Sequence, residues 1–223
     1  MKTGHRIRTS TLVLLTALCW AGALGLSLAA AGDNVLPGDL WLTRQIQRID
    51  FPGIGRLERA GYYIGSTEGF MLAGLAVLIA LAIARRLEAA LLIAGVLLVR
   101  PLNALLKELI GSPRPSADLV NVATDATTDP TSMGFPSGHT MSAALLYGAL
   151  IYLAAVIIRP RRLRLAIQAA AAATIILVAL SRIYSGAHWP SDTLGGALWA
   201  CAFLGILIWA QRAARHRHRA ERS

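Results

Sequence analysis

Long apolar runs are the feature of this sequence that most restricts its fold. Six stretches consist mainly of Leu, Ile, Val, Ala and Gly, and each has roughly the 20 residues that a helix needs to cross a bilayer. The hydrophobic fraction of the chain is 55%, and its concentration in blocks is typical of membrane proteins. We therefore predict an all-α polytopic membrane protein, a bundle of six transmembrane helices. The predicted spans are Thr11–Ala31, Ile64–Ala84, Ala89–Ile110, Ser137–Ile158, Leu165–Ile183 and Pro190–Ala210.

The 223 residues suit one integral membrane domain, residues 1–223, with a motif-bearing core at residues 100–210. The first apolar run is longer than the apolar region of a signal peptide, so we expect a retained helix; cleavage after Ala29–Ala31 is the alternative. The first outer loop, Asp33–Tyr63, is polar and aromatic. A short interfacial helix is predicted in this loop, with four side chains on one face: Leu40, Trp41, Ile46 and Ile49.

Positive charge is distributed unevenly along the chain, whose net charge is +10. With six spans, both termini and the turns at Arg85 and Arg159 lie on one side of the membrane. That side carries 14 of the 22 Lys and Arg, and only Glu88 and Glu221 of the 12 acids. Basic segments stay in the cytoplasm, so we expect cytoplasmic termini in a multi-pass protein of the cell membrane. The pattern argues against a nucleic-acid partner and fits anionic membrane lipids.

A polar cluster separates the fifth and sixth predicted spans, in the sequence S-R-I-Y-S-G-A-H-W-P-S-D (Ser181–Asp192). Asp192 follows His188 by four residues. If a helix begins between them, the carboxylate can fix the imidazole tautomer and leave the other ring nitrogen free to attack. Arg182 can bind an oxyanion through its forked donors. Polar groups at membrane depth usually mark function; the alternative is a loop with a few interfacial polar residues.

Two further stretches lie at the same, outer ends of the predicted helices: K-E-L-I-G-S-P-R-P (Lys107–Pro115) and P-S-G-H (Pro136–His139). The start of a helix offers free N–H groups and the positive end of its dipole, which together bind anions. Ser137 is a candidate N-cap, and Gly138 allows the backbone to approach an oxyanion closely. Lys107, Arg114 and Arg182 would add three cations, more than a carboxylate needs and as many as a phosphate requires.

The three stretches together resemble the signature of the type 2 phosphatidic acid phosphatases, or lipid phosphate phosphatases: K-x6-R-P, then P-S-G-H, then S-R-x5-H-x3-D. The resemblance covers residues 107–192, and the first hundred residues carry no motif. All eleven specified positions are matched, in order: Lys107, Arg114, Pro115, Pro136, Ser137, Gly138, His139, Ser181, Arg182, His188 and Asp192.

This resemblance implies a role for each site residue. His188 would be the nucleophile that forms a phosphohistidine, Asp192 would orient it, and His139 would be the general acid and later the base. The phosphoryl oxygens would contact five further residues: Lys107, Arg114, Arg182, Ser137 and Gly138. Ser181 would either bind phosphate or cap the end of its helix. The resemblance implies no metal ion and no cofactor.

The expected function is hydrolysis of a lipid phosphomonoester or diphosphate at the outer face of the membrane. Undecaprenyl diphosphate, phosphatidylglycerol phosphate, phosphatidic acid and the phosphate of lipid A all fit as substrates, and the sequence leaves the choice and the oligomeric state open. A phosphotransferase with another acceptor is one alternative, and a non-enzymatic lipid transporter is another. Vanadium haloperoxidases share the signature, but they are soluble, and six spans argue against them.

Overall fold

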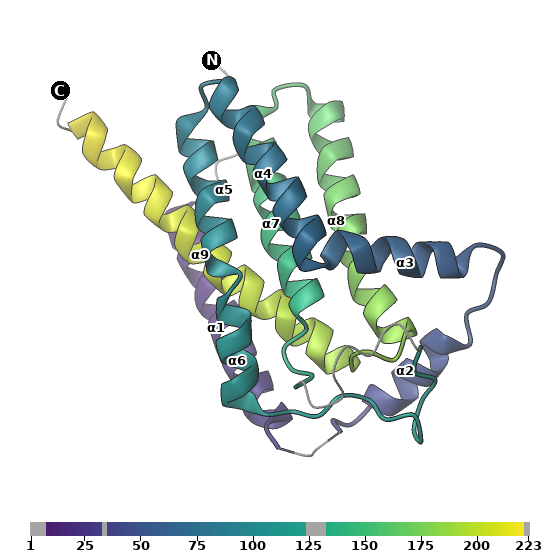
Figure 1. Cartoon of the computed structure of the whole chain (residues 1–223). Coiled ribbons are helices and arrows are strands. Elements are labelled where there is room, and N and C mark those ends of the chain that lie inside the picture. Colours follow the sequence, from purple (N-terminus) through teal and green to yellow (C-terminus); the bar gives the residue numbers. More distant parts are fainter. Residues whose placement is uncertain (1–7, 33–34, 124–132, 221–223) are drawn as a thin grey trace.

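The computed structural model describes residues 8–32, 35–123 and 133–220, with side chains in the last segment as far as residue 214. These residues form helices joined by turns and loops (Figure 1), and the all-α prediction is confirmed. The helices are α1 (Thr9–Ala30), α2 (Asp39–Gln47), α3 (Ile54–Gly65), α4 (Thr67–Ile83), α5 (Leu87–Val99), α6 (Leu102–Ile110), α7 (Gly138–Ile157), α8 (Arg161–Tyr184) and α9 (Pro190–Ala220).

The helices form a bundle in which α4, α5, α7 and α8 run alongside one another, and α1 and α9 cross them together (Figure 1). Five spans are long and apolar enough to cross a membrane: α1, α5 with α6, α7, α8 and α9. The pair α3 and α4 passes the same test as a unit bent by 63°. The structure therefore supports five membrane spans, or six if the bent pair is one of them.

Side-chain exposure in the bundle is that of a membrane protein. Large apolar side chains such as Leu28 and Leu98, both 79% exposed, face outward, where lipid would cover them. The interior centres on α7 and α9. Trp20 of α1 packs edge-on against Trp199 of α9, with 5.0 Å between ring centroids. The indole N–H of Trp199 donates to Ser27 at 3.1 Å, so α1 is fastened along α9.

Two predicted spans differ from the observed helices. The third was expected to run unbroken over Ala89–Ile110, but α5 ends at Val99 and α6 begins at Leu102. Pro101 causes the break, because it lacks an N–H and its ring collides with the preceding turn. The second span starts later than expected, at Thr67, and follows the sharp bend after α3.

Arg100 lies at the break between α5 and α6. Its guanidinium donates to the hydroxyls of Thr67 and Ser142. Arg100 thus connects the α5–α6 junction to α4 and α7, which is the structural pairing expected of a cation at this depth.

The first outer loop contains two helices rather than one short helix. Helix α2 covers most of the predicted interfacial segment, whereas α3 was not predicted. A Cβ on Gly61 would lie 2.5 Å from the Oγ of Ser181, and one on Gly65 would lie 2.6 Å from Val178. Only glycine allows α3 to approach α8 this closely.

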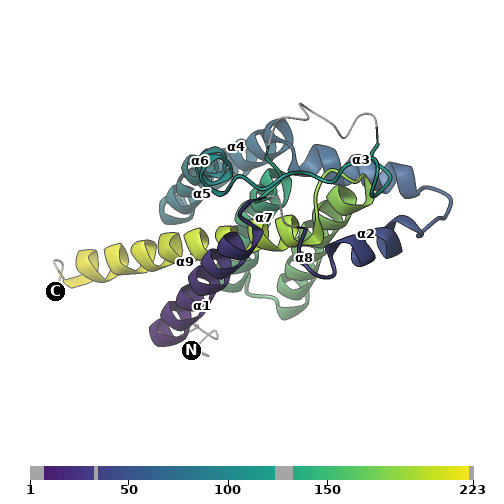
Figure 2. The same cartoon turned by 90° about the horizontal axis from the view of Figure 1, so that it is seen from below.

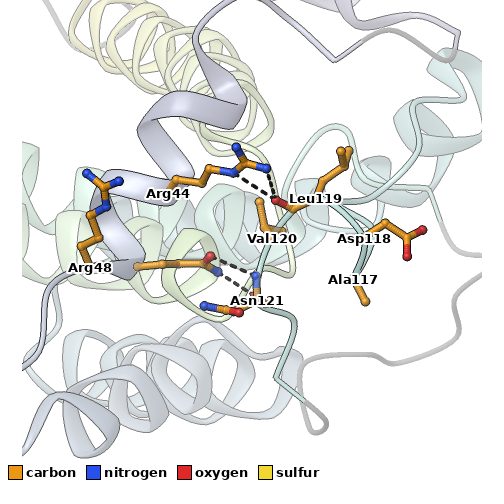
Figure 3. A pocket seen from close by; sticks show the side chains of 8 residues that line it. Arg44, Arg48, Ala117, Asp118, Leu119, Val120 and Asn121 are labelled. Carbon is orange, nitrogen blue, oxygen red and sulfur yellow. Dashed lines mark hydrogen bonds between the residues drawn. The ribbon is translucent and has the colours of Figure 1, made fainter.

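Helix α2 is joined to the loop after α6 (Figure 3). Arg44 donates to the carbonyl of Leu119 through Nε and Nη2 at 3.2 and 3.0 Å. Gln47 exchanges hydrogen bonds with the backbone of Asn121 and also donates to the carbonyl of Tyr184 at 3.0 Å. A cavity of about 370 Å³ lies between α2 and this loop. Viewed from below, the loop crosses the end of the bundle toward α2 and α3 (Figure 2).

Candidate active site

The three motif stretches meet at one end of the bundle, opposite the α4–α5 and α7–α8 turns (Figure 1). They comprise the end of α6 and the loop after it, the start of α7, and the connection from α8 to α9. Hydrogen bonds join these segments: the backbone N–H of Ser137 donates to the carbonyl of Asp192 at 2.9 Å, and Arg114 donates to the carbonyl of Ala187 at 3.0 Å.

His188 and Asp192 form a buried pair. His188 lies in the α8–α9 connection, and Asp192 lies in the first turn of α9, which begins at Pro190. The Nδ1 atom of His188 is 3.2 Å from Oδ2 of Asp192, and Oδ2 also accepts the backbone N–H of Trp189 at 2.9 Å. An ionised Asp192 would accept the Nδ1 proton, which leaves the lone pair on Nε2. The local helix start that this pairing requires is therefore present.

Three cations act on the imidazole of His188. The ring is only 2% exposed, and this burial lowers the pKa of His188 well below its ordinary value. The positive charges of Lys107, Arg114 and Arg182 lower the pKa further. These charges come from α6, the following loop and α8, so three separate segments each place a positive charge within electrostatic reach of one ring. Under these conditions His188 is neutral at physiological pH, as a nucleophile or base must be.

The start of α7 is fixed by α6 and α9. Ser137 is its N-cap, and its Oγ accepts the backbone N–H of Thr140 at 3.5 Å. A Cβ on Gly138 would lie 2.8 Å from the Oδ1 of Asn103 in α6, so this close approach requires glycine. The N–H groups of this first helical turn are the kind that bind anions.

Two of the cations are oriented by backbone carbonyl groups. The ammonium of Lys107 donates to the carbonyls of Met133 and Gly134, just before the P-S-G-H stretch. Arg114 donates to the carbonyl of Ala187, next to His188. Each cation is thereby held next to another motif stretch that is distant from it in the sequence.

The third cation, Arg182, contacts α3. It is 2% exposed, and its Nη1 lies 3.7 Å from Oε1 of Glu58. Its guanidinium carbon is 5.1 Å from the ring centroid of Tyr62. The same tyrosine ring lies 5.1 Å from the imidazole of His139, whose Nε2 is buried and has no hydrogen-bond partner among the described residues.

Ser181 lies where α8 contacts α3. Its hydroxyl donates to the carbonyl of Val178 at 2.8 Å, and Gly61 packs directly against it. The structure thus gives Ser181 a bond within its own helix and a place in the helix contact.

Several residues that contact the site were not among the predicted site residues. Asp39 of α2 accepts the backbone N–H and the hydroxyl of Ser191 at 2.9 and 2.6 Å, one residue before Asp192. Glu58 and Tyr62 contact Arg182, and Asn103 packs on Gly138. The one local signal was spacing: Glu58 and Tyr62 are four residues apart, as are Asn103 and Lys107, which places each pair on one helix face.

A second cavity, of about 240 Å³, lies beside Glu58 and Ser185 and extends to Gln47 of α2. Glu58 both lines this cavity and pairs with Arg182, so the cavity adjoins the site. Across the described ranges, no three His, Cys, Asp or Glu side chains are grouped as metal ligands.

The sequence model of the PAP2 superfamily matches residues 86–216, which is more than half of the chain. The chain belongs to the PAP2 superfamily. The matched region contains all three motif stretches and extends from the α4–α5 turn into the last turns of α9, so the resemblance to these phosphatases is confirmed.

Two curated relatives of this PAP2 protein are phosphatases by name. Phosphatidylglycerophosphatase B of Bacillus subtilis (strain 168) is 36% identical over 112 residues, which cover 49% of each protein. Lipid A 4'-phosphatase of Rhizobium leguminosarum is 30% identical over 149 residues, which cover 62% of this chain and 60% of that protein. The matches thus span about half to three fifths of the relatives' length.

Two solved structures share the fold. One is the crystal structure of a transmembrane PAP2 type phosphatidylglycerolphosphate phosphatase from Bacillus subtilis, with a TM-score of 0.72 and 22% identity over 86% of this chain and 93% of that one. The other is the crystal structure of Aquifex aeolicus LpxE, with a TM-score of 0.56 and 26% identity over 77% and 94%. The likeness confirms a multi-pass, all-α membrane fold.

Proposed function

We propose that this PAP2 protein is a membrane phosphatase that hydrolyses a phosphomonoester or diphosphate of a lipid. The observation that carries the proposal is the buried His188–Asp192 pair with three cations acting on its imidazole. A phosphate is the anion whose charge matches so many donors. Membership of the superfamily and the names of the two curated relatives support the same reaction class.

In the first step, Nε2 of His188 attacks phosphorus, while Asp192 stabilises the charge that develops on the ring. The bond from phosphorus to the lipid oxygen breaks, and His139, protonated once the negative charge of the bound phosphate offsets the neighbouring cations, gives its proton to that oxygen. The phosphoryl oxygens contact Lys107, Arg114, Arg182, the hydroxyl of Ser137 and the N–H of Gly138, since the N–H of Ser137 is bonded to Asp192. Such positioned donors supply most of the catalysis in phosphoryl transfer.

In the second step, water attacks the phosphohistidine, and His139 takes a proton from that water. The phosphorus–nitrogen bond breaks, inorganic phosphate leaves, and His188 returns to its neutral form with His139 protonated again. Ser181, with its hydroxyl turned to Val178, supports the end of α8 rather than the phosphate in this scheme.

We further propose that the site faces the outside of the cell membrane and that both termini lie in the cytoplasm. The turns with Arg85 and Arg159 lie at the end of the bundle away from the site (Figure 1), and basic turns stay in the cytoplasm. Candidate substrates are therefore lipids with an exposed phosphate, of the undecaprenyl diphosphate, phosphatidylglycerol phosphate, phosphatidic acid or lipid A type.

The test is phosphate release by the detergent-purified full chain from a panel of these four lipid classes, with and without a chelator. Phosphate should appear with water as the sole acceptor, equally in both conditions. A base-quenched reaction with radiolabelled lipid phosphate should label the protein, and His188→Ala should remove both the label and the activity.

The other functions predict different results. A phosphotransferase would release label only to an added acceptor, and a transporter would release none and would tolerate His188→Ala. Undiminished hydrolysis by His188→Ala would rule out the phosphohistidine route.

A further inference from the structure

Helix α3 brings an aromatic ring to the site without carrying any motif. Tyr62 is half-buried, and its ring contacts both His139 and Arg182, two of the proposed site residues. The imidazole of His139 is 5.1 Å from it, centroid to centroid and tilted by 36°. The guanidinium of Arg182 is also 5.1 Å from the ring centroid, within the range of a cation–π contact.

The position of this ring is fixed by backbone contacts on both sides of it. Gly61 packs on Ser181, the residue before Arg182, and Gly65 packs on Val178 and on the Cβ of His139. At these two glycines the backbone of α3 lies so close to α8 that sliding one helix along the other would cause a collision. The ring of Tyr62 is therefore held in one position relative to His139 and Arg182.

Glu58 precedes Tyr62 by four residues, so both side chains lie on the same face of α3. Its carboxylate is 3.7 Å from Nη1 of Arg182, and both side chains are largely buried. One face of α3 thus supplies two contacts to the same guanidinium: an ion pair that directs it and an aromatic surface that supports it.

We infer that Tyr62 is a positioning residue of the active site, whose ring sets His139 and Arg182 in register, with Glu58 directing the guanidinium. The inference rests on the proposed function, in which His139 protonates the leaving oxygen and Arg182 binds the phosphoryl group. Misplacing a reacting group by about 1 Å costs on the order of 100-fold in rate. Loss of the ring should therefore act on kcat more than on KM.

The dependence on the leaving group separates positioning from general support. A lipid alkoxide needs a proton from His139 to depart, whereas the nitrophenolate of p-nitrophenyl phosphate departs as a stable anion. A misplaced His139 slows the lipid substrate more. A misplaced Arg182 slows both substrates alike, because the phosphoryl group is the same.

The experiment compares Tyr62→Leu, Tyr62→Phe and the matched control Tyr63→Leu, each as detergent-purified full chain. The substrates are p-nitrophenyl phosphate and the lipid phosphomonoester of the panel above that the wild type hydrolyses fastest. Tyr63 is 65% exposed and meets the ring of Tyr62 edge-on, with 5.3 Å between ring centroids. For Tyr62→Leu we expect about a 10- to 100-fold loss of kcat on the lipid, with KM changed less than about threefold, and a smaller loss on the aryl phosphate. Tyr62→Phe and Tyr63→Leu should stay within about threefold of wild type, since both keep the contacts of the ring at position 62 with His139 and Arg182.

Glu58→Gln should lower kcat by the same factor on both substrates, because Glu58 acts through Arg182 alone. Equal losses on the two substrates in Tyr62→Leu, or a loss in Tyr62→Phe as large as in Tyr62→Leu, would overturn the inference. So would a matching loss in Tyr63→Leu. If the wild type releases phosphate from none of the four lipid classes of the panel, the proposed function itself fails.

Discussion

Two regions of the molecule meet at the same end of the bundle and differ in what they contribute. The motif segment (residues 107–192) brings the ionisable groups that face one another, such as His188 and Asp192. The support segment (residues 39–65, helices α2 and α3) contacts these groups from outside: Asp39 binds Ser191, and Tyr62 packs on Arg182. The reacting groups are concentrated in the motif segment, whereas the support segment holds them in place. Substitutions in the motif segment should therefore cost the most activity, and those in the support segment should cost less activity or lower stability.

His188→Asn should give the largest effect, because it removes the proposed nucleophile while keeping a similar volume. We expect a loss of kcat on the order of 10⁴-fold or more with little change in the thermal midpoint. Phosphate release and a melting curve in detergent check both parts. Activity near that of wild type would mean that His188 is not the nucleophile.

Asp192→Asn should come next, with about a 10²- to 10⁴-fold loss of kcat. The amide oxygen can still accept the N–H of Trp189, but it no longer favours the tautomer of His188 with a free Nε2. A pre-steady-state burst assay would show slower formation of the phosphoenzyme. A loss seen only in KM would contradict this role.

Asp39→Ala should lower the stability of the protein more than its activity. It leaves the buried N–H and hydroxyl of Ser191 without their partner, at a cost of about 1 to 3 kcal/mol. The thermal midpoint should fall clearly, and kcat should fall less than in Asp192→Asn. Asp50→Ala, at an exposed position of the same segment, is the control and should leave the midpoint unchanged.

A pH titration measures the environment of His188 without substrate. Its pKa is lowered in the folded protein, so below pH 6.5 the unfolded chain binds a proton that the folded chain excludes. Folded-state stability therefore falls as pH falls through 6.5, by about 1.4 kcal/mol at pH 5.5 if the folded pKa lies well below that value. His188→Asn lacks this dependence, so the wild type should lose stability relative to it on acidification. Parallel curves would contradict the lowered pKa.

Gln47→Ala should have the smallest effect, about 0.5 to 1.5 kcal/mol of stability. It removes hydrogen bonds from α2 to Asn121 and Tyr184. Amide hydrogen exchange should rise in residues 117–123 and stay constant around His188. Gln45→Ala, on the same helix, should leave that loop protected; exchange that rises equally in both variants would mean that Gln47 does not fasten the loop.

The sequence predicted the bundle because a bilayer imposes one length and one polarity on every span. Helices α1, α7 and α9 begin within two residues of the expected positions. The break at Pro101 was missed because membrane helices often tolerate proline, so an apolar run containing it has two interpretations. Helix α3 was missed because its three glycines lower its intrinsic helix propensity, and its stability comes from packing on α8.

Within the site, contacts between residues close in the sequence could be predicted, and contacts between distant residues could not. The pairing of His188 with Asp192 needed only a spacing of four residues and a helix start at Pro190, both visible locally. Tyr62 and Glu58 meet Arg182 more than a hundred residues later, and Asp39 meets Ser191 across 152 positions. No local spacing encodes such contacts, so they required the coordinates.

The length of α9 ties the site to the thickness of its surroundings. Its membrane span, Pro190–Ala214, has 25 residues and forms a rod of about 37 Å, against the roughly 30 Å of hydrocarbon in a typical bilayer. Asp192 stands on the first turn of that rod, and α1 braces it at Trp199. A change of tilt in a thinner or thicker bilayer would move this carboxylate together with the whole helix.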